Sequence, residues 1–166
     1  NGIAVRSKRS EPREGILLAI TNSLSRTQFS TKYFSLEELG VGADIDSQDG
    51  YANTQALLRY SSYLPALMKC ISYRFPDGQY GYLGSSFEMS LIYSWRTEIE
   101  ECLTALGITF PSMTSEYVWS STPSSTTTAT TLYVLARSVE RNSTSYASSN
   151  TRYYVWPIGK VGDWSK

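Results

Sequence analysis

One apolar run stands out in an otherwise polar first third of the chain. Residues 15–20 read Gly-Ile-Leu-Leu-Ala-Ile, and a continuous run of this length predicts a strand buried on both faces. Residues 21–54 are polar and turn-rich, and the glycines and aspartates between 40 and 50 predict a loop. Ser35 before Leu36-Glu37-Glu38 predicts a short helix, because a serine hydroxyl caps free backbone N–H groups and acidic residues suit a first turn.

Helical spacing begins at Asn53. Apolar residues then recur at intervals of three and four as far as Ile71. Pro65 opens a second segment of this region, since its missing N–H costs nothing in the first turn of a helix. The turn-forming sequence Phe75-Pro76-Asp77-Gly78 ends it. We therefore expect two consecutive helical segments here.

A second pair of helices is predicted between residues 85 and 106. Glu88 lies three residues after Ser85, which is the spacing of a capping box, and the apolar residues that follow keep the helical period. A further helix is expected from Thr97, and Gly107 supplies the residue type that most often ends a helix.

The last third has no helical period. Three segments rich in aromatic and β-branched residues, 117–119, 131–139 and 153–158, predict strands separated by polar sequence. The order is strand, loop, helices and then an antiparallel β region. We therefore predict a single domain over residues 1–166, of α+β class, with two helices packed on a small antiparallel sheet and a C-terminal β region.

Composition narrows the chemistry of the chain. Lysine plus arginine equals aspartate plus glutamate, at 15 each, so no global field attracts nucleic acid or anionic membranes. The chain has no histidine, the commonest general base and zinc ligand, and we expect neither a catalytic site nor a bound metal or cofactor. No apolar run approaches the roughly 20 residues of a membrane span. The chain opens with Asn1-Gly2 rather than methionine, and we expect a mature or excised piece of a longer secreted protein.

The two cysteines, Cys70 and Cys102, lie in apolar, helix-like stretches. We expect two small buried hydrophobic residues, with a structural disulfide between them as the alternative in an oxidising compartment.

Three further motifs have ordinary explanations. The aspartates at 44, 46 and 49 resemble a calcium loop, but their spacing departs from an EF-hand and Gln55 stands where a glutamate is required, so turn capping is favoured. Asn142-Ser143-Thr144 fits the glycosylation pattern, to which we give little weight. The glutamates at 98, 100 and 101 favour a solvated first turn over a pair of catalytic carboxylates.

An ordered series of motifs resembles a known family. The pieces are Asp49-Gly50-Tyr51-Ala52-Asn53-Thr54, then Gly81-Tyr82-Leu83 leading into Glu88-Met89, then Tyr117-Val118-Trp119-Ser120-Ser121-Thr122, and finally Tyr153-Tyr154-Val155-Trp156-Pro157-Ile158. Together they are similar to the bacterial C-type-lectin-like domains of surface lipoproteins, fimbrial tip subunits and phage receptor-binding proteins. The match covers residues 45–160, and the strand at 15–20 is in the expected place.

The chain departs from the family pattern twice. Gly84 stands where a proline is usual at the start of a helix, and Trp156 stands where the terminal strand usually carries arginine.

The resemblance also implies a variable region. A subset of the family is diversified by retroelements that mutate adenines, which scatters asparagine codons into Ser, Thr, Tyr and related residues. About half of the residues between Ser112 and Arg152 are serine or threonine. We therefore expect a diversified surface within residues 117–158, and we expect most of the Ser/Thr tract at 120–131 to be permissive surface.

Strand alternation selects candidate binding residues within this region. Leu132, Val134 and Ala136 make the more apolar face of one strand, and Val155 suggests the core face of the last strand. The opposite faces, with residues of the loop between the two strands, predict a ligand-binding surface of tyrosine, arginine, asparagine and tryptophan, which are types suited to binding. Its members are Tyr133, Arg137, Arg141, Asn142, Tyr146, Arg152, Tyr154 and Trp156.

These observations predict a non-enzymatic binding domain on a bacterial cell surface or phage particle. Its partner is expected to be a protein or glycan on another cell or phage. Two alternatives are a structural fimbrial or surface subunit without a diversified site, and an enzyme of the related fold that oxidises a sulfatase cysteine. The second requires thiols placed for copper or redox chemistry, which the expected core positions of Cys70 and Cys102 disfavour.

Overall fold

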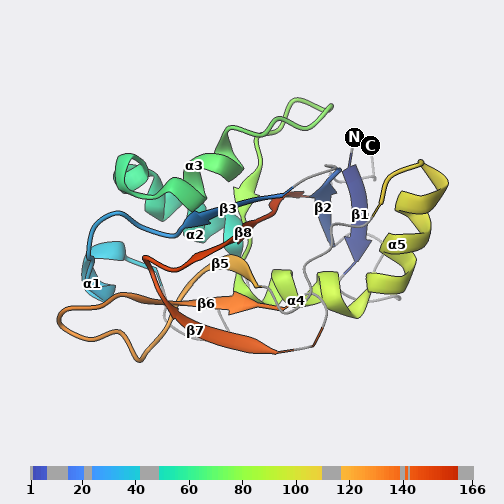
Figure 1. The fold of residues 1–166 in the computed structure, drawn as a ribbon. Coiled ribbons are helices and arrows are strands. Elements are labelled where there is room, and N and C mark those ends of the chain that lie inside the picture. Colours follow the sequence, from blue (N-terminus) through green and yellow to red (C-terminus); the bar gives the residue numbers. More distant parts are fainter. Residues whose placement is uncertain are drawn as a thin grey trace.

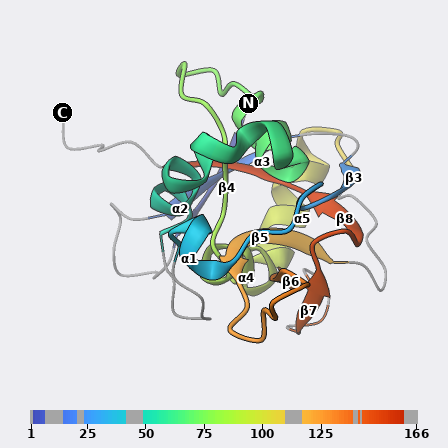
Figure 2. The same cartoon turned by 90° about the vertical axis from the view of Figure 1, so that its left-hand side faces the viewer.

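The computed structural model of the protein describes residues 2–6, 15–20, 24–41, 49–109, 117–138, 141 and 143–160 (Figure 1). Within them the fold is mixed α+β, with five α-helices, a 3-10 helix and two sheets. Helices α2 and α3 lie on one side of the strands and α4 on the other, as both orthogonal views show (Figures 1 and 2). The predicted α+β class is confirmed.

A four-stranded sheet joins the early and late parts of the chain. Its order is β1 (Gly2–Arg6), β2 (Gly15–Ala19), β9 (Pro157–Lys160) and β4 (Tyr82–Leu83), all antiparallel. Strand β2 confirms the prediction for residues 15–20, and Ile16 and Leu18 are buried in it. The hydrophobic pattern did not predict β1.

A five-stranded sheet holds most of the C-terminal region. Its order is β3 (Ser25–Gln28), β8 (Arg152–Val155), β5 (Val118–Pro123), β6 (Tyr133–Arg137) and β7 (Thr144–Ser148). Neighbours are antiparallel except β5 and β8. The sequence between the predicted strands at 131–139 and 153–158 was expected to be a loop, which is wrong for residues 144–148, since they form β7. Both β3 and β7 are edge strands with little apolar sequence, so only their backbone pairing reveals them.

The helices follow the capping signals in the sequence. They are α1 (Leu36–Leu39), α2 (Gly50–Leu57) continued by η1 (Leu58–Tyr63), α3 (Pro65–Ile71), α4 (Ser86–Ser94) and α5 (Arg96–Ala105). The predicted capping box forms at Ser85 with Glu88, and the predicted cap at Ser35 also forms a capping box, with Glu38. The cap at Ser85 forms although Gly84 stands where the family usually has a proline. Gly107 adopts a left-handed conformation (φ 70°) just beyond α5, which confirms the predicted stop.

Two hydrophobic cores lie against the sheets, and each contains one buried tryptophan. Trp156 packs with residues of β2, α4 and α5, whereas Trp119 packs with residues of α2 and α3. Each indole N–H donates a hydrogen bond to a backbone carbonyl, Trp156 to Ala19 (2.9 Å) and Trp119 to Thr27 (2.8 Å). A buried indole therefore ties each of two early strands to the C-terminal region.

The carboxylate of Glu88 connects three elements in the interior. One of its oxygens accepts the backbone N–H groups of Gly50 (2.9 Å) and Ser85 (2.8 Å), and the other accepts the hydroxyl of Tyr82 (2.8 Å). We call these four residues the Glu88 junction. A Cβ atom at Gly50 would lie only 2.7 Å from the backbone carbon of residue 84, so glycine permits this close approach of α2 to α4.

Strand β5 carries the Trp-Ser-Ser-Thr sequence, and all six of its residues are buried. Ser120 donates its hydroxyl to the carbonyl of Leu135 (2.7 Å), and the hydroxyl of Thr122 accepts the N–H of Ser86 (3.0 Å). The expectation that the Ser/Thr tract at 120–131 lies at the surface is therefore wrong for residues 120–124. These residues are buried, and their polar groups form hydrogen bonds inside the protein. The expectation holds for residues 125, 126 and 128–130, which are exposed.

The cysteines differ in their surroundings. Cys70 of α3 is fully buried, and burial raises the pKa of its thiol. Cys102 of α5 is exposed, so the prediction of two buried residues is wrong for Cys102, which faces solvent because Ile99 and Leu103 occupy the buried side of that helix. Both thiols are free.

Substitution of Glu88 tests the energetic weight of the junction. Glu88→Ala leaves three buried donors without an acceptor, and we expect it to lower the free energy of unfolding by at least about 3 kcal/mol. Glu88→Gln keeps an oxygen for the two N–H groups and an amide for the tyrosine hydroxyl, and we expect a loss of roughly 1 kcal/mol. Urea denaturation measures the free energy of unfolding of both variants. Equal losses would show that the hydrogen bonds of Glu88 contribute little to stability.

The pH dependence of the free energy of unfolding provides a second test of the role of Glu88. Burial raises the pKa of Glu88 above its ordinary value of 4.5, although hydrogen bonds from Ser85, Tyr82 and Gly50 oppose that shift. Between that value and the folded-state pKa, the folded protein binds the extra proton, so its free energy of unfolding falls as pH rises. The difference in stability between wild type and Glu88→Gln therefore changes with pH in this window, with the wild type relatively more stable at the acidic end.

Candidate binding surface

Strand register places three of the predicted residues on one face of the five-stranded sheet. In the β6–β7 pair, Tyr133 lies opposite Ser148 and Tyr146 opposite Leu135. Directly paired residues share a face, so Tyr133, Arg137 and Tyr146 point to the same side. Leu132, Val134 and Ala136 are buried, as the alternation predicted. The face assignment for β6 is therefore confirmed.

Helix α4 covers part of this face. Leu135 is buried, and the guanidinium of Arg137 donates to the carbonyl of Ser86 (3.1 Å) and to the hydroxyl of Thr144 (2.5 Å). Partial burial lowers the pKa of Arg137. Arg137 therefore connects α4 to the sheet, while Tyr146, with 53% of its surface exposed, remains available to a partner.

The predicted residues of β8 form a separate group. Arg152 is exposed and Tyr154 is half-buried, with the guanidinium of Arg26 stacked 4.9 Å above the centre of its ring. Strand β5 separates β8 from β6, and its Val118 lies in register with both Arg137 and Tyr154. Val118 is buried in the core that contains residues of α4, so the predicted surface is divided into two groups rather than forming one stripe.

Trp156 was predicted to face solvent, and this is wrong. Its side chain is only 2% exposed, and the preceding Val155 is 3% exposed. The two-residue alternation continues through Trp156, since Tyr153 and Val155 contact one core whereas Tyr154 and Trp156 contact the other. The face that was expected to meet solvent is covered by this second core. Consecutive side chains therefore enter different cores.

The remaining predicted residues lie between β6 and β7. Arg141 is exposed, and its backbone N–H donates to the hydroxyl of Ser138 (3.1 Å). Asn142 lies outside the described residues.

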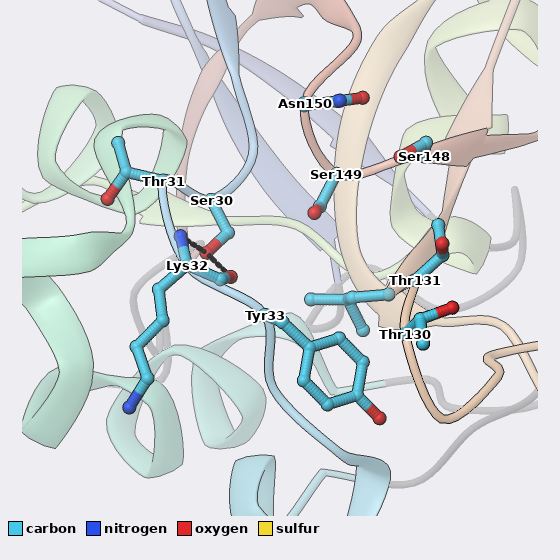
Figure 3. Close-up of a pocket in the computed structure, with 10 residues that line it drawn as sticks. Ser30, Thr31, Lys32, Tyr33, Thr130, Thr131, Ser148, Ser149 and Asn150 are labelled. Atoms are coloured by element: carbon cyan, nitrogen blue, oxygen red, sulfur yellow. Dashed lines mark hydrogen bonds between the residues drawn. The ribbon is translucent and has the colours of Figure 1, made fainter.

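A concave site lies at one end of the five-stranded sheet, close to the exposed part of the Ser/Thr tract (Figure 3). Segments 30–33, 130–132 and 148–150 enclose a volume of about 200 Å³, which we call the loop cavity. Backbone hydrogen bonds fix its walls: the carbonyl of Ser149 accepts the N–H groups of Phe29 (2.8 Å) and Ser30 (3.1 Å), and the N–H of Ser149 donates to Leu132 (2.8 Å).

Hydroxyl groups dominate the lining of the loop cavity. The lining residues are Ser30, Thr31, Lys32, Tyr33, Thr130, Thr131, Leu132, Ser148, Ser149 and Asn150. The hydroxyl of Tyr33 donates to the carbonyl of Thr128 (2.8 Å), which fixes the ring against the opposite wall. The ammonium of Lys32 lies 5.1 Å and 5.5 Å from the rings of Phe34 and Tyr63. The cavity thus has one cation, directed elsewhere, and no acid in its lining.

Sequence reasoning missed the contribution of residues 30–33. They fall in the polar stretch that predicts only turns, and no local pattern relates them to residues 148–150. The relation follows from the pairing of β3 with β8, which brings these two distant segments together.

Three other findings bear on the chemistry. Within the part of the chain that the structure describes, no three His, Cys, Asp or Glu side chains are grouped as metal ligands. Asp49 caps α2 by accepting the N–H of Ala52 (2.9 Å), whereas Asp44 and Asp46 fall outside that part. None of the described helices has the length and apolar character to cross a membrane.

Comparison of the chain with protein-family models, with curated proteins and with solved structures gave no match in any of the three.

The opposite environments of Trp156 and Tyr146 lead to a paired prediction. We expect Trp156→Ala to lower the free energy of unfolding by about 3–5 kcal/mol, because it removes a fully buried indole and its hydrogen bond. Tyr146→Ala is expected to change it by less than about 1 kcal/mol. Urea denaturation of both variants measures these changes in the free energy of unfolding. A Trp156→Ala variant as stable as the wild type would show that Trp156 faces solvent, as the sequence predicted.

Proposed function

We propose that the protein is a ligand-binding domain of the C-type-lectin-like kind, with its binding surface at the loop cavity and the adjoining exposed face of β7. The observation that carries the proposal is the location of the cavity. Two of its three walls come from the Ser/Thr-rich region for which a variable surface was expected, and backbone bonds of Ser149 to Phe29, Ser30 and Leu132 join all three. Such a site is preorganised yet tolerant of side-chain change.

The meeting of the motif residues supports the proposed fold relationship. The segment at 81–83 pairs with the final strand at 157–158, and the carbonyl of Gly84 accepts the N–H of Ser121 (2.7 Å). The amide of Asn53 donates to the hydroxyl of Ser121 (3.1 Å). All four pieces that carry the resemblance are therefore joined in space, so they act as a structural signature of one scaffold.

The burial pattern narrows the proposed variable region. Strand β5 is buried throughout, so diversification at 118–123 would disturb the core. Exposed positions are found at 125–130, at Tyr146 and between 150 and 152, apart from half-buried residues at 127 and 151. We propose that diversity is confined to these positions and to the segment around Arg141, while Arg137 and Trp156 stay constant.

The alternative of a structural subunit has one observation in its favour. Strand β7 is the edge of its sheet, and an edge strand presents unpaired backbone groups to a neighbouring chain. In a fimbrial or surface assembly this edge would pair with another subunit, and the purified domain would self-associate. The exposed hydroxyl-rich residues around the cavity favour the binding function instead, since subunit contacts are usually more apolar.

The proposed setting is extracellular, on a bacterial cell or a phage particle, with a protein or glycan of another surface as partner. The proposed activity is binding without catalysis. Tyrosine and small hydroxyl residues suit it, because tyrosine gives a large contact area at a small entropic cost and hydroxyls adapt their hydrogen bonds.

Flow cytometry of a panel of bacterial strains with fluorescently labelled protein tests the proposal. We expect saturable binding to at least one strain, and at least a tenfold weaker apparent affinity for Tyr146→Ala combined with Asn150→Ala. Tyr80→Ala is the matched control, because Tyr80 is also exposed (62%, against 53% for Tyr146) but lies outside the proposed surface.

Two outcomes would contradict the proposed function. One is the absence of saturable binding to every strain beyond that of heat-unfolded protein. The other is concentration-dependent oligomerisation in sedimentation experiments that Tyr146→Ala abolishes, which would support the structural subunit.

A further inference from the structure

We propose that the loop cavity binds a single neutral sugar unit of a glycan, without a metal ion. This inference rests on the proposed binding function and specifies its ligand class. It follows from the groups that line the cavity, from which of them are already hydrogen-bonded, and from its size.

The free hydrogen-bonding capacity of the cavity lies in its side chains. Within the described part of the chain, the side chains of Thr130, Thr131, Ser148, Ser149 and Asn150 make no hydrogen bond to the protein. Figure 3 shows the Ser149 hydroxyl directed into the space between the walls. Four hydroxyls and an amide offer both donors and acceptors, which is the pairing that the hydroxyls of a sugar require.

The ring of Tyr33 supplies an apolar surface beside these polar groups. Its hydroxyl is held by the carbonyl of Thr128, so the ring stays at the cavity wall and has little rotational freedom to lose on binding. A pyranose has an apolar C–H face and a rim of hydroxyls. A fixed aromatic ring with an opposing fringe of hydroxyls complements both of these features.

Charge distinguishes a neutral sugar from an anionic one. The cavity lining contains no aspartate, glutamate, histidine or cysteine, so it offers neither a metal-ligand set nor a general base. Its one cation, Lys32, leaves the cavity in Figure 3 and stacks near Phe34 and Tyr63. A carboxylate or sulfate in the cavity would therefore lose water without gaining a fixed positive partner.

The size of the cavity suits one ring. Its volume of about 200 Å³ is below the roughly 300 Å³ at which pockets for drug-sized molecules begin. A hexose has about 12 non-hydrogen atoms, and a ligand of this size in an open polar site is expected to bind in the millimolar range. Longer glycans would gain further contacts from the exposed residues outside the cavity, such as Tyr146.

Amide chemical-shift perturbation in ¹⁵N-labelled protein tests the inference. The probes are the methyl glycosides of glucose, galactose, mannose and N-acetylglucosamine, compared with sialic acid and glucuronate. We expect saturable shifts of amides at 30–33, 130–132 and 148–150 with at least one neutral glycoside, and at least tenfold weaker binding of the two acids.

A double variant tests the role of the free side chains. Ser148→Ala combined with Asn150→Ala is expected to weaken binding of the neutral glycoside at least tenfold. Ser62→Ala combined with Ser125→Ala is the matched control, because both serines are outside the cavity lining, and it is expected to bind as the wild type does. Thermal melting of both variants confirms that each is folded.

Several results would overturn the inference: no saturable shift with any neutral glycoside, tighter binding of the acids, shifts that map away from the cavity, or equal loss in the two double variants. Binding of bacterial cells with no binding of sugars would remove this inference while leaving the proposed function intact. Binding of sugars with no binding of cells would leave this inference intact while contradicting the proposed binding to another cell surface.

Discussion

Three consecutive residues, Gly84, Ser85 and Ser86, hold the fold together through their backbone groups. The carbonyl of Gly84 accepts from Ser121 in β5, the N–H of Ser85 donates to Glu88, and the N–H of Ser86 donates to Thr122. The carbonyl of Ser86 in turn accepts from Arg137 of β6. A turn at the start of one helix is thereby fixed to two strands and, through the Glu88 carboxylate, to the start of α2. Because these groups are buried, each lost bond leaves a donor or acceptor that water cannot satisfy.

This constraint separates scaffold from binding surface. The buried network occupies the middle of the molecule, where β5 is inaccessible on both sides. The loop cavity lies at the sheet end, where backbone bonds of Ser149 and the bond from the Tyr33 hydroxyl to Thr128 join the walls. Side chains at the cavity other than Tyr33 can therefore change without loss of the fold. A protein whose surface is to be diversified needs this separation, because a mutation that also weakens the core would be lost through instability.

The sequence predicted local features well and spatial relations poorly. The capping residues Ser35 and Ser85, the helix stop at Gly107 and the buried strand at 15–20 depend on neighbours within a few positions, so their patterns are readable. Trp156 was misplaced because alternation shows which residues share a face but not whether that face is covered, and here each face packs against a core. The serines of β5 resembled a surface tract because their hydrogen-bond partners, Leu135 and Asn53, are distant in sequence. The edge strands at 25–28 and 144–148 carry too little apolar sequence to be recognised before their partners are known.

Native-state hydrogen exchange of individual amides tests the division into scaffold and surface most directly. The amides of Gly50, Ser86 and Ser121 are expected to exchange only through global unfolding, with an opening free energy equal to the unfolding free energy from denaturation. The amides of Ser125 and Asn150 are expected to exchange orders of magnitude faster by local opening. Exchange of the first three at the rate of the loop amides would contradict the account, because the proposed scaffold would then open without the fold unfolding.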